Sequence, residues 1–150
     1  MKVLITGAAG FIGFHTCQAL LARGETVIGI DDLNPYYDVR LKEARLAELG
    51  RSSGFVFVKA DIADRAAMED VARRHRDITH IVNLAAQAGV RYSLTNPFAY
   101  SRSNVEGHLV MLEMARNLDR CGHFVYASSS SVYGANRKLP FAVEDRVDHP

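Results

Sequence analysis

Three glycines at a fixed spacing constrain the fold of this chain more than any other feature. Gly7, Gly10 and Gly13 form a Gly-x-x-Gly-x-x-Gly pattern within "ITGAAGFIG". The apolar run at 2–6 is typical of a buried strand, and the run at 12–23 carries apolar residues at helical spacing. Such a turn lets a pyrophosphate approach the backbone while the N–H groups at the helix start face the anion. The pattern predicts a dinucleotide-binding loop, with a simple glycine-rich turn as the alternative.

The rest of the chain continues the alternation of strands and helices. Apolar runs predict further strands at 26–30, 55–60, 80–86 and 123–128, and helical patterns lie at 39–50, 64–75 and 98–118. This order calls for a parallel sheet covered on both faces, which explains why the strand runs are almost continuously apolar. The sequence therefore predicts the α/β class, as a Rossmann-type doubly wound parallel sheet of about five strands. The polar segment 136–150 is typical of a loop, so we expect a fold truncated before a substrate domain.

Composition excludes several classes of protein. The chain has 150 residues, the size of one domain, and 18 Lys and Arg against 17 Asp and Glu give a net charge of +1. This balance offers no basic surface for nucleic acid and no polybasic face for a membrane. Glycines and polar residues in the apolar N-terminal stretch argue against a signal peptide. The two cysteines and six histidines show no metal-ligand spacing. We expect a reduced, cytoplasmic protein with no metal, no nucleic acid partner and no membrane association.

An acidic residue follows the second predicted strand. Asp31 lies 18 positions beyond Gly13 (31 − 13), close to the offset of about 20 that is typical of dinucleotide-binding units. A carboxylate there accepts hydrogen bonds from both adenosine ribose hydroxyls and repels a 2′-phosphate. No Arg or Lys occurs between Thr26 and Asp38 to hold such a phosphate. The sequence favours NAD over NADP, with a surface aspartate beside a glycine-rich turn as the alternative.

Six segments of the chain resemble one family. They are "ITGAAGFIG", "DDLN", "KADIAD", "NLAAQAGVRYS", "SNVEGHLVMLE" and "YASSSSVYG". Together they resemble the extended short-chain dehydrogenase/reductases, the NAD-dependent epimerases and dehydratases that act on sugar nucleotides. "NPYYDVRLKEARL" and "AGVRYSL" are most similar to the UDP-glucuronate 4-epimerases, and the resemblance covers essentially the whole chain. It implies a Rossmann domain, bound NAD and a nucleotide-sugar substrate.

The resemblance implies a role for each matching residue. It assigns to NAD the residues Gly7, Gly10, Phe11, Ile12 and Gly13 at the pyrophosphate, Asp31 and Asp32 at the ribose, Asp61 and Ile62 at the adenine, Leu84, Ala85, Ala86, Gln87 and Ser128 at the nicotinamide half, and Asn104 beneath the cofactor. A polar spot on a helix is the alternative for Asn104, because Asn is not favoured in a helix interior.

The serine tract in "YASSSSVYG" follows the fifth predicted strand, where ligands lie in open parallel sheets, rather than a linker. By the resemblance, Ser129 hydrogen-bonds the reacting hydroxyl of the sugar and Ser130 contacts its C5 substituent. Arg91 is a candidate to hold a uronate carboxylate, with a solvated loop arginine as the alternative. Dehydrating relatives carry two carboxylates directly before "VYG", where this chain has Ser130 and Ser131. Dehydration and decarboxylation are therefore disfavoured, because neither serine transfers protons at neutral pH.

The resemblance implies conversion of UDP-glucuronate to UDP-galacturonate, with the C4 hydride passing to NAD and returning to the other face of a 4-keto sugar. The family's Tyr-x-x-x-Lys pair is absent, since none of the six tyrosines has a lysine four residues later. We therefore expect the N-terminal part of a longer enzyme, homodimeric when intact, and an inactive 1–150 fragment. The alternatives are an epimerase for another UDP-sugar, such as UDP-glucose, and a non-catalytic NAD-sensing module; a reductase using NADPH is disfavoured by Asp31.

Overall fold

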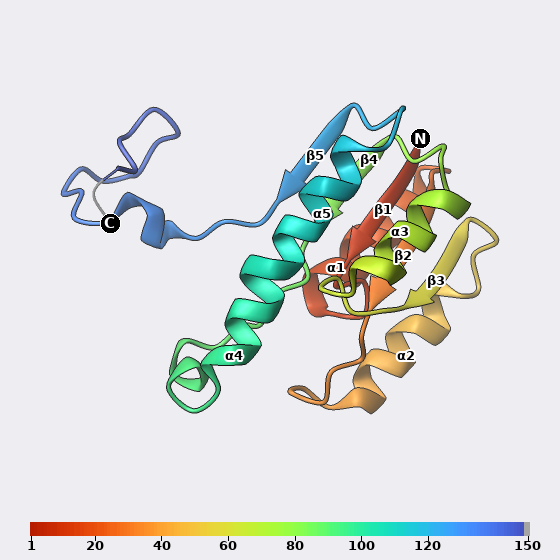
Figure 1. Cartoon of the computed structure of the whole chain (residues 1–150), viewed down its shortest axis with the longest axis horizontal. Helices are drawn as coiled ribbons and strands as arrows, with labels where there is room; N and C mark the ends of the chain where they lie inside the picture. Colours follow the sequence, from red (N-terminus) through yellow and green to blue (C-terminus); the bar gives the residue numbers. More distant parts are fainter. Residues whose placement is uncertain (149–150) are drawn as a thin grey trace.

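The structure is a computed structural model that describes residues 1–148 (Figure 1). Its strands are β1 (Lys2–Thr6), β2 (Thr26–Asp31), β3 (Phe55–Lys59), β4 (His80–Asn83) and β5 (His123–Tyr126). Its α-helices are α1 (Phe11–Ala22), α2 (Val39–Leu49), α3 (Arg65–Arg74), α4 (Pro97–Tyr100) and α5 (Gly107–Arg116). A π-helix, Ser101–Glu106, joins α4 to α5, and 3₁₀ turns lie at Val90–Leu94 and Ser130–Tyr133.

The strands form one parallel sheet in the order β3-β2-β1-β4-β5. This arrangement confirms the predicted doubly wound α/β fold. From β1 the chain builds outward through β2 to β3, and then crosses to the other side of β1 to add β4 and β5. In such sheets the carboxyl ends of the strands at this reversal, here β1 and β4, border a crevice where ligands bind.

The sheet separates two apolar cores. Leu4 packs with Met68 and Met111 of α3 and α5 on one face, whereas Val3 and Ile5 pack with α1 and α2 on the other. Neighbouring residues of β1 therefore point into different cores, and the four positions from Val3 to Thr6 are all buried. This burial on both faces accounts for the continuous apolar runs in the sequence.

Two strands end at least two residues earlier than the apolar runs predict. β4 ends at Asn83, three residues early, because the next two backbone N–H groups, of Leu84 and Ala85, donate to Thr6 Oγ1 at 3.1 and 3.0 Å instead of to a strand. β5 ends at Tyr126, two residues early. An apolar run alone does not reveal where a side chain takes over the hydrogen bonds of a strand.

The helix predicted at 98–118 is present in three pieces. The Asn96 side chain caps α4 by accepting the Ala99 N–H at 3.3 Å, and the π-helix then separates α4 from α5. One wide π turn leaves the apolar spacing on either side almost unchanged, so the sequence pattern did not reveal it. Such π turns are common at functional sites.

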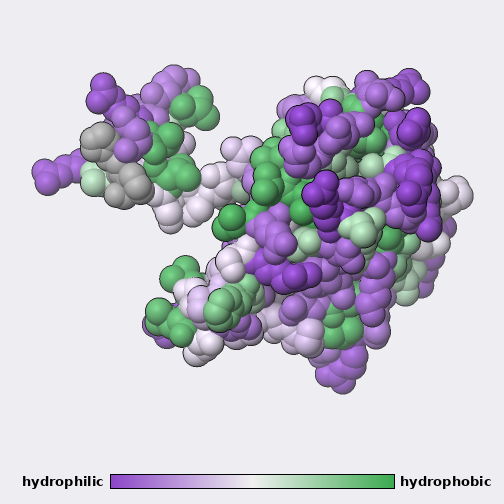
Figure 2. Space-filling model, viewed as in Figure 1, coloured by the Kyte–Doolittle hydropathy of each residue, from purple (hydrophilic) through white to green (hydrophobic). Residues whose placement is uncertain are grey.

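After β5 the chain leaves the body of the molecule, and residues 127–148 stand apart from the sheet in Figure 1. Apolar side chains lie exposed along the same side: Figure 2 shows them over β5 and α5, around α4 and on the segment after β5. Phe98, Val105 and Leu109 are examples, each more than half exposed at 81%, 68% and 58%. No helix within residues 1–148 is both long and apolar enough to span a membrane.

Candidate functional site

The glycine loop between β1 and α1 is shaped by two close backbone approaches. Gly7 has a φ of +70°, and a Cβ there would lie 3.0 Å from the Ala85 nitrogen. A Cβ on Gly13 would lie 2.1 Å from the Gly7 carbonyl oxygen, so no side chain fits at this position of α1. Only glycine lets the helix begin this close to the strand end.

The start of α1 has no side chain that could satisfy its N–H groups. Its N-cap is Gly10, no side-chain cap bond is present, and the first turn holds no acidic residue. The positive end of the helix dipole therefore faces outward beside the loop, as an anion site requires. Arg45 fixes the loop from α2 by donating to the Ala9 carbonyl at 3.1 Å, a contact that the sequence patterns did not indicate.

Asp31 lies at the end of β2 and is 6% exposed. Its Oδ2 accepts the Ala9 N–H at 3.1 Å, and its Oδ1 accepts the Leu33 N–H at 2.9 Å and Lys42 Nζ at 3.0 Å. A carboxylate has about four acceptor sites. Three are therefore occupied, and one remains on Oδ2 for a ligand.

Lys42 is a cation beside Asp31 that the sequence patterns did not indicate. The segment between Thr26 and Asp38 holds no cation, but α2 brings the buried Lys42, four residues beyond Asp38, next to Asp31. Its ammonium also lies 4.0 Å from the Asp32 carboxylate. Two carboxylates surround one ammonium, so the local charge remains negative and still opposes a 2′-phosphate. That Asp31 accepts hydrogen bonds from both ribose hydroxyls stays a prediction.

A crevice of about 150 Å³ opens at the carboxyl edge of the sheet. Ten of the fifteen residues predicted for NAD line it: Gly7, Gly10, Asp31, Asp32, Asp61, Ile62, Leu84, Ala85, Ala86 and Gln87. Lys42, Tyr36 and Tyr37 line it as well, and the sequence patterns did not assign them to it. The structure thus brings together residues from the carboxyl ends of β1, β2, β3 and β4.

Two side-chain contacts shape the loop that follows β4. Thr6 Oγ1 accepts the two N–H groups described above and donates to Asn83 Oδ1 at 2.6 Å. Further along, Asn104 on the π-helix accepts the Gln87 N–H at 2.8 Å and donates to the Gln87 carbonyl at 3.1 Å. Asn104 therefore holds the backbone of a crevice residue rather than lining the crevice itself. Thr6 was not predicted, since its hydroxyl looks like one more β-branched strand residue.

Tyrosines join two loops beside the crevice. The Tyr36 and Tyr92 rings lie 4.8 Å apart between centroids, and the Tyr100 hydroxyl donates to the carbonyls of Ala88, at 3.0 Å, and Gly89. Loss of contact with water, and then the neighbouring tyrosines, raise the pKa of Tyr100. Aromatic contacts thus tie the loop after β2 to the loop after β4, although the two are more than fifty residues apart in sequence.

The remaining predicted residues lie outside the crevice. Phe11 and Ile12 are exposed at the start of α1, and Gly13 is buried beneath the loop. Arg91 is exposed in the 3₁₀ turn after Gly89. A separate group, Ser128, Ser129 and Ser130, is exposed in the segment that follows β5, where Ser129 Oγ is bonded to Ser131 rather than to the crevice.

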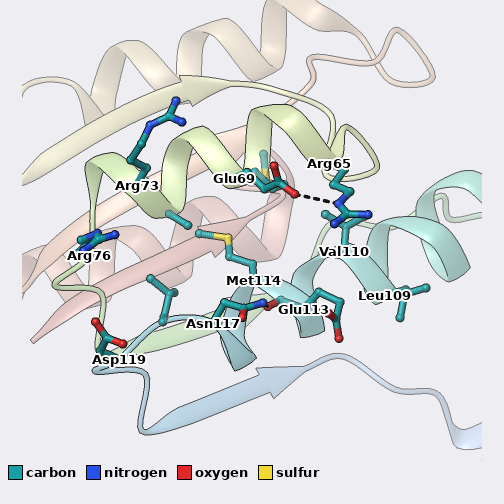
Figure 3. A pocket seen from close by; sticks show the side chains of 13 residues that line it. Arg65, Glu69, Arg73, Arg76, Leu109, Val110, Glu113, Met114, Asn117 and Asp119 are labelled. Carbon is teal, nitrogen blue, oxygen red and sulfur yellow. Dashed lines mark hydrogen bonds and ion pairs between the residues drawn. The ribbon is translucent and has the colours of Figure 1, made fainter.

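A second cavity, of about 550 Å³, lies between α3 and α5 (Figure 3). Its floor is apolar, with Met68 and Met114, and its rim carries the Arg65–Glu69 ion pair at 2.8 Å. It opens on helix faces away from the strand ends, whereas the smaller crevice lies at the strand ends beside the glycine loop and Asp31, so the crevice is the candidate site. Residues 1–148 contain no cluster of three or more His, Cys, Asp or Glu that could hold a metal; His149 lies outside the described residues.

Comparisons with known proteins identify the family. The family model described as GDP-mannose 4,6 dehydratase matches residues 4–150. A probable UDP-glucuronate 4-epimerase of Rhizobium meliloti is 53% identical over the whole chain, which covers 43% of that relative, and UDP-glucuronate 4-epimerase 3 of Arabidopsis thaliana is 49% identical over 99% of the chain and 34% of its own length. The chain thus spans less than half the length of these curated relatives.

A solved structure agrees with the sequence matches. A variant UDP-glucuronic acid 4-epimerase of Bacillus cereus, crystallised with UDP-4-deoxy-4-fluoro-glucuronic acid and NAD, superposes with a TM-score of 0.84. It is 35% identical, over 97% of this chain and 45% of that one. The chain therefore belongs to the GDP-mannose 4,6 dehydratase family of NAD-dependent epimerases and dehydratases, and the resemblance seen in the sequence is confirmed.

Proposed function

We propose that this chain, as a member of that family, is the NAD-binding part of a nucleotide-sugar epimerase that converts UDP-glucuronate to UDP-galacturonate. The observation that carries the proposal is the crevice at the reversal of strand order, which gathers the glycine loop, Asp31 and Asp61 beside the start of α1. The similarity to UDP-glucuronate 4-epimerases along the whole chain supports the substrate.

The residues present fit NAD. The glycine loop, together with the uncapped start of α1, suits the pyrophosphate, because Gly13 lets the helix begin directly beneath the loop. The free acceptor site on Asp31 Oδ2 suits one ribose hydroxyl, and Lys42 has N–H groups left to donate to the other. Asp61 and Ile62 then border the adenine. The negative balance around Lys42 supports NAD over NADP.

Bound NAD would supply the hydride acceptor and donor for C4 of the sugar. In this proposal the Ser129 hydroxyl hydrogen-bonds the C4 oxygen, and Arg91 pairs its guanidinium with the uronate carboxylate. Ser128 would lie beside the nicotinamide and Ser130 beside the C5 substituent. Ser130 and Ser131 have no carboxylate to protonate a leaving hydroxyl, which supports epimerisation over dehydration.

The Tyr-x-x-x-Lys pair and the substrate domain would belong to chain beyond these 150 residues, and the fragment alone would bind NAD without turnover. That division, the homodimer and the cytoplasmic setting stay predictions. The competing function, NAD sensing without chemistry, uses the same crevice. It gives no reason for a serine tract directly after β5.

Proton NMR of the intact protein with UDP-glucuronate and no added NAD tests the proposal. Appearance of UDP-galacturonate is expected, since the cofactor remains bound through a cycle without net redox. The Ser129→Ala variant should lose most of the rate, whereas Ser53→Ala, an exposed serine before β3, should not. An unchanged sugar even with added NAD would refute the uronate assignment, and conversion of UDP-glucose instead would favour the other UDP-sugar epimerases.

A further inference from the structure

A chain of side-chain hydrogen bonds runs from α5 to the floor of the crevice. His108 Nδ1 lies 3.0 Å from Asn83 Nδ2, and Asn83 Oδ1 accepts the Thr6 hydroxyl at 2.6 Å. The hydroxyl oxygen in turn accepts the N–H groups of Leu84 and Ala85. The Thr6 side of this chain is buried, with Thr6 at 0% and Asn83 at 6% exposed.

Each bond in this chain fixes the direction of the next. Because Asn83 Nδ2 carries only donors, His108 Nδ1 must be an acceptor, which requires a neutral ring with its proton on Nε2. That leaves Asn83 Oδ1 to face Thr6, whose hydroxyl then donates. Both acceptor sites of the Thr6 oxygen are consequently free for the two backbone N–H groups.

A protonated ring would break this order. Its Nδ1–H would face the Asn83 NH₂ group, and the amide would have to turn over. Asn83 would then offer N–H to the Thr6 oxygen, which already accepts two N–H bonds and has no third site. One backbone N–H of Leu84 or Ala85 would lose its acceptor, and the loop beneath the crevice would loosen.

His108 also contacts β5, the strand beside β4. Its ring lies 5.0 Å from that of Tyr126 and 5.9 Å from that of Phe124, both on β5, and the Asn83 carbonyl accepts the Ala127 N–H at 3.3 Å. Tyr126 is the titratable group among these contacts.

We propose that His108 is a positioning residue for the dinucleotide site: its neutral ring orients the Asn83 amide and, through Thr6, the backbone of Leu84 and Ala85. This inference rests on the proposed NAD site. It makes NAD affinity fall when His108 is protonated, so the cofactor is held less tightly in acid.

Isothermal titration of NAD into the cofactor-free intact protein at pH 7.5 and 5.5 tests this. His108→Asn keeps an acceptor near the position of Nδ1 but does not titrate, and His108→Leu removes the acceptor. The unaltered protein should lose about tenfold in affinity between the two pH values, His108→Asn less than about twofold, and His108→Leu should be about tenfold weaker at both. The matched control is His123→Asn, at the opposite end of β5, which should keep the unaltered pH profile.

The outcomes separate the two proposals. If the unaltered protein binds no NAD at either pH, the cofactor site itself is wrong. If it binds NAD but His108→Asn shows the same loss in acid, or His108→Leu binds as tightly as the unaltered protein, the positioning role alone is wrong. Should His108→Leu fail to fold, as judged by thermal melting, the pH profile of His108→Asn still decides.

Discussion

Removal of the ammonium of Lys42 should be among the most destabilising single changes at the crevice. The side chains of Lys42 and Asp31 are 11% and 5% exposed, and their charged atoms lie 3.0 Å apart. Loss of one partner of a buried ion pair typically costs about 3–5 kcal/mol, because the other charge is left uncompensated. Asp31 keeps its two backbone N–H donors and borders the crevice, so the lower end applies, and we expect Lys42→Met to cost about 3 kcal/mol.

Urea unfolding measures this cost directly. With a slope of about 2 kcal/mol per molar urea, the midpoint should fall by about 1.5 M. Asp31→Asn and the double variant complete a thermodynamic cycle, in which we expect a coupling energy of about 2 kcal/mol between the two side chains. A midpoint shift below about 0.3 M, or a cycle that is additive, would refute the reasoning, since either result means that the pair carries no net stabilisation.

Three further predictions concern the glycine loop, the thiols and one histidine. Gly13→Ala should cost more than about 2 kcal/mol in urea unfolding, because its Cβ would lie 2.1 Å from a loop carbonyl oxygen, whereas Gly122→Ala, with nothing within 4 Å, should be near neutral; equal costs would contradict the packing argument. Burial raises the pKa of Cys17 to about 12, so a thiol reagent should label Cys121 first and Cys17 only on unfolding, and early labelling of Cys17 would contradict this. Burial and then a nearby lysine lower the pKa of His75, so the folded state resists protonation of this ring. The free energy of unfolding should therefore decrease as the pH drops below about 6.5. His75→Gln should therefore lose less stability between about pH 7 and about pH 5 than the unaltered protein, and an identical pH profile would contradict this.

The sequence predicted the features that depend on local pattern. The glycine spacing and the five apolar runs were enough for the sheet and for the loop at Gly7 and Gly13, because the missing Cβ and the two-sided burial are properties of single residues and short runs. Asp31 was likewise found from its distance along the chain. Ten of the fifteen residues assigned to NAD line one crevice, since parallel strand ends meet at one edge of a sheet.

What the sequence did not reveal depends on contacts between distant segments. Lys42 reaches Asp31 because α2 packs back across β2, and nothing in the run "VRLKEARL" distinguishes this lysine from a solvated one. The Thr6 hydroxyl ends β4 because it accepts the N–H groups of Leu84 and Ala85, although Thr6 lies 78 residues before Leu84 in the chain. Asn104 was selected by resemblance, and its bonds to the Gln87 backbone give it a structural reason that helix periodicity could not supply.

The two halves of the crevice are built in different ways, and this bears on how the proposed reaction would be controlled. In the proposed site, the adenosine half is held by charge and sterics, through the glycine loop and the Asp31–Lys42 pair. The other half is held by neutral hydrogen bonds that start at His108, the residue type whose charge ordinarily changes in that range. Acid should therefore loosen the nicotinamide end while the adenosine end stays formed. ADP-ribose, which lacks the nicotinamide, should lose less affinity in acid than NAD does, because its remaining contacts lie mostly on the half away from His108.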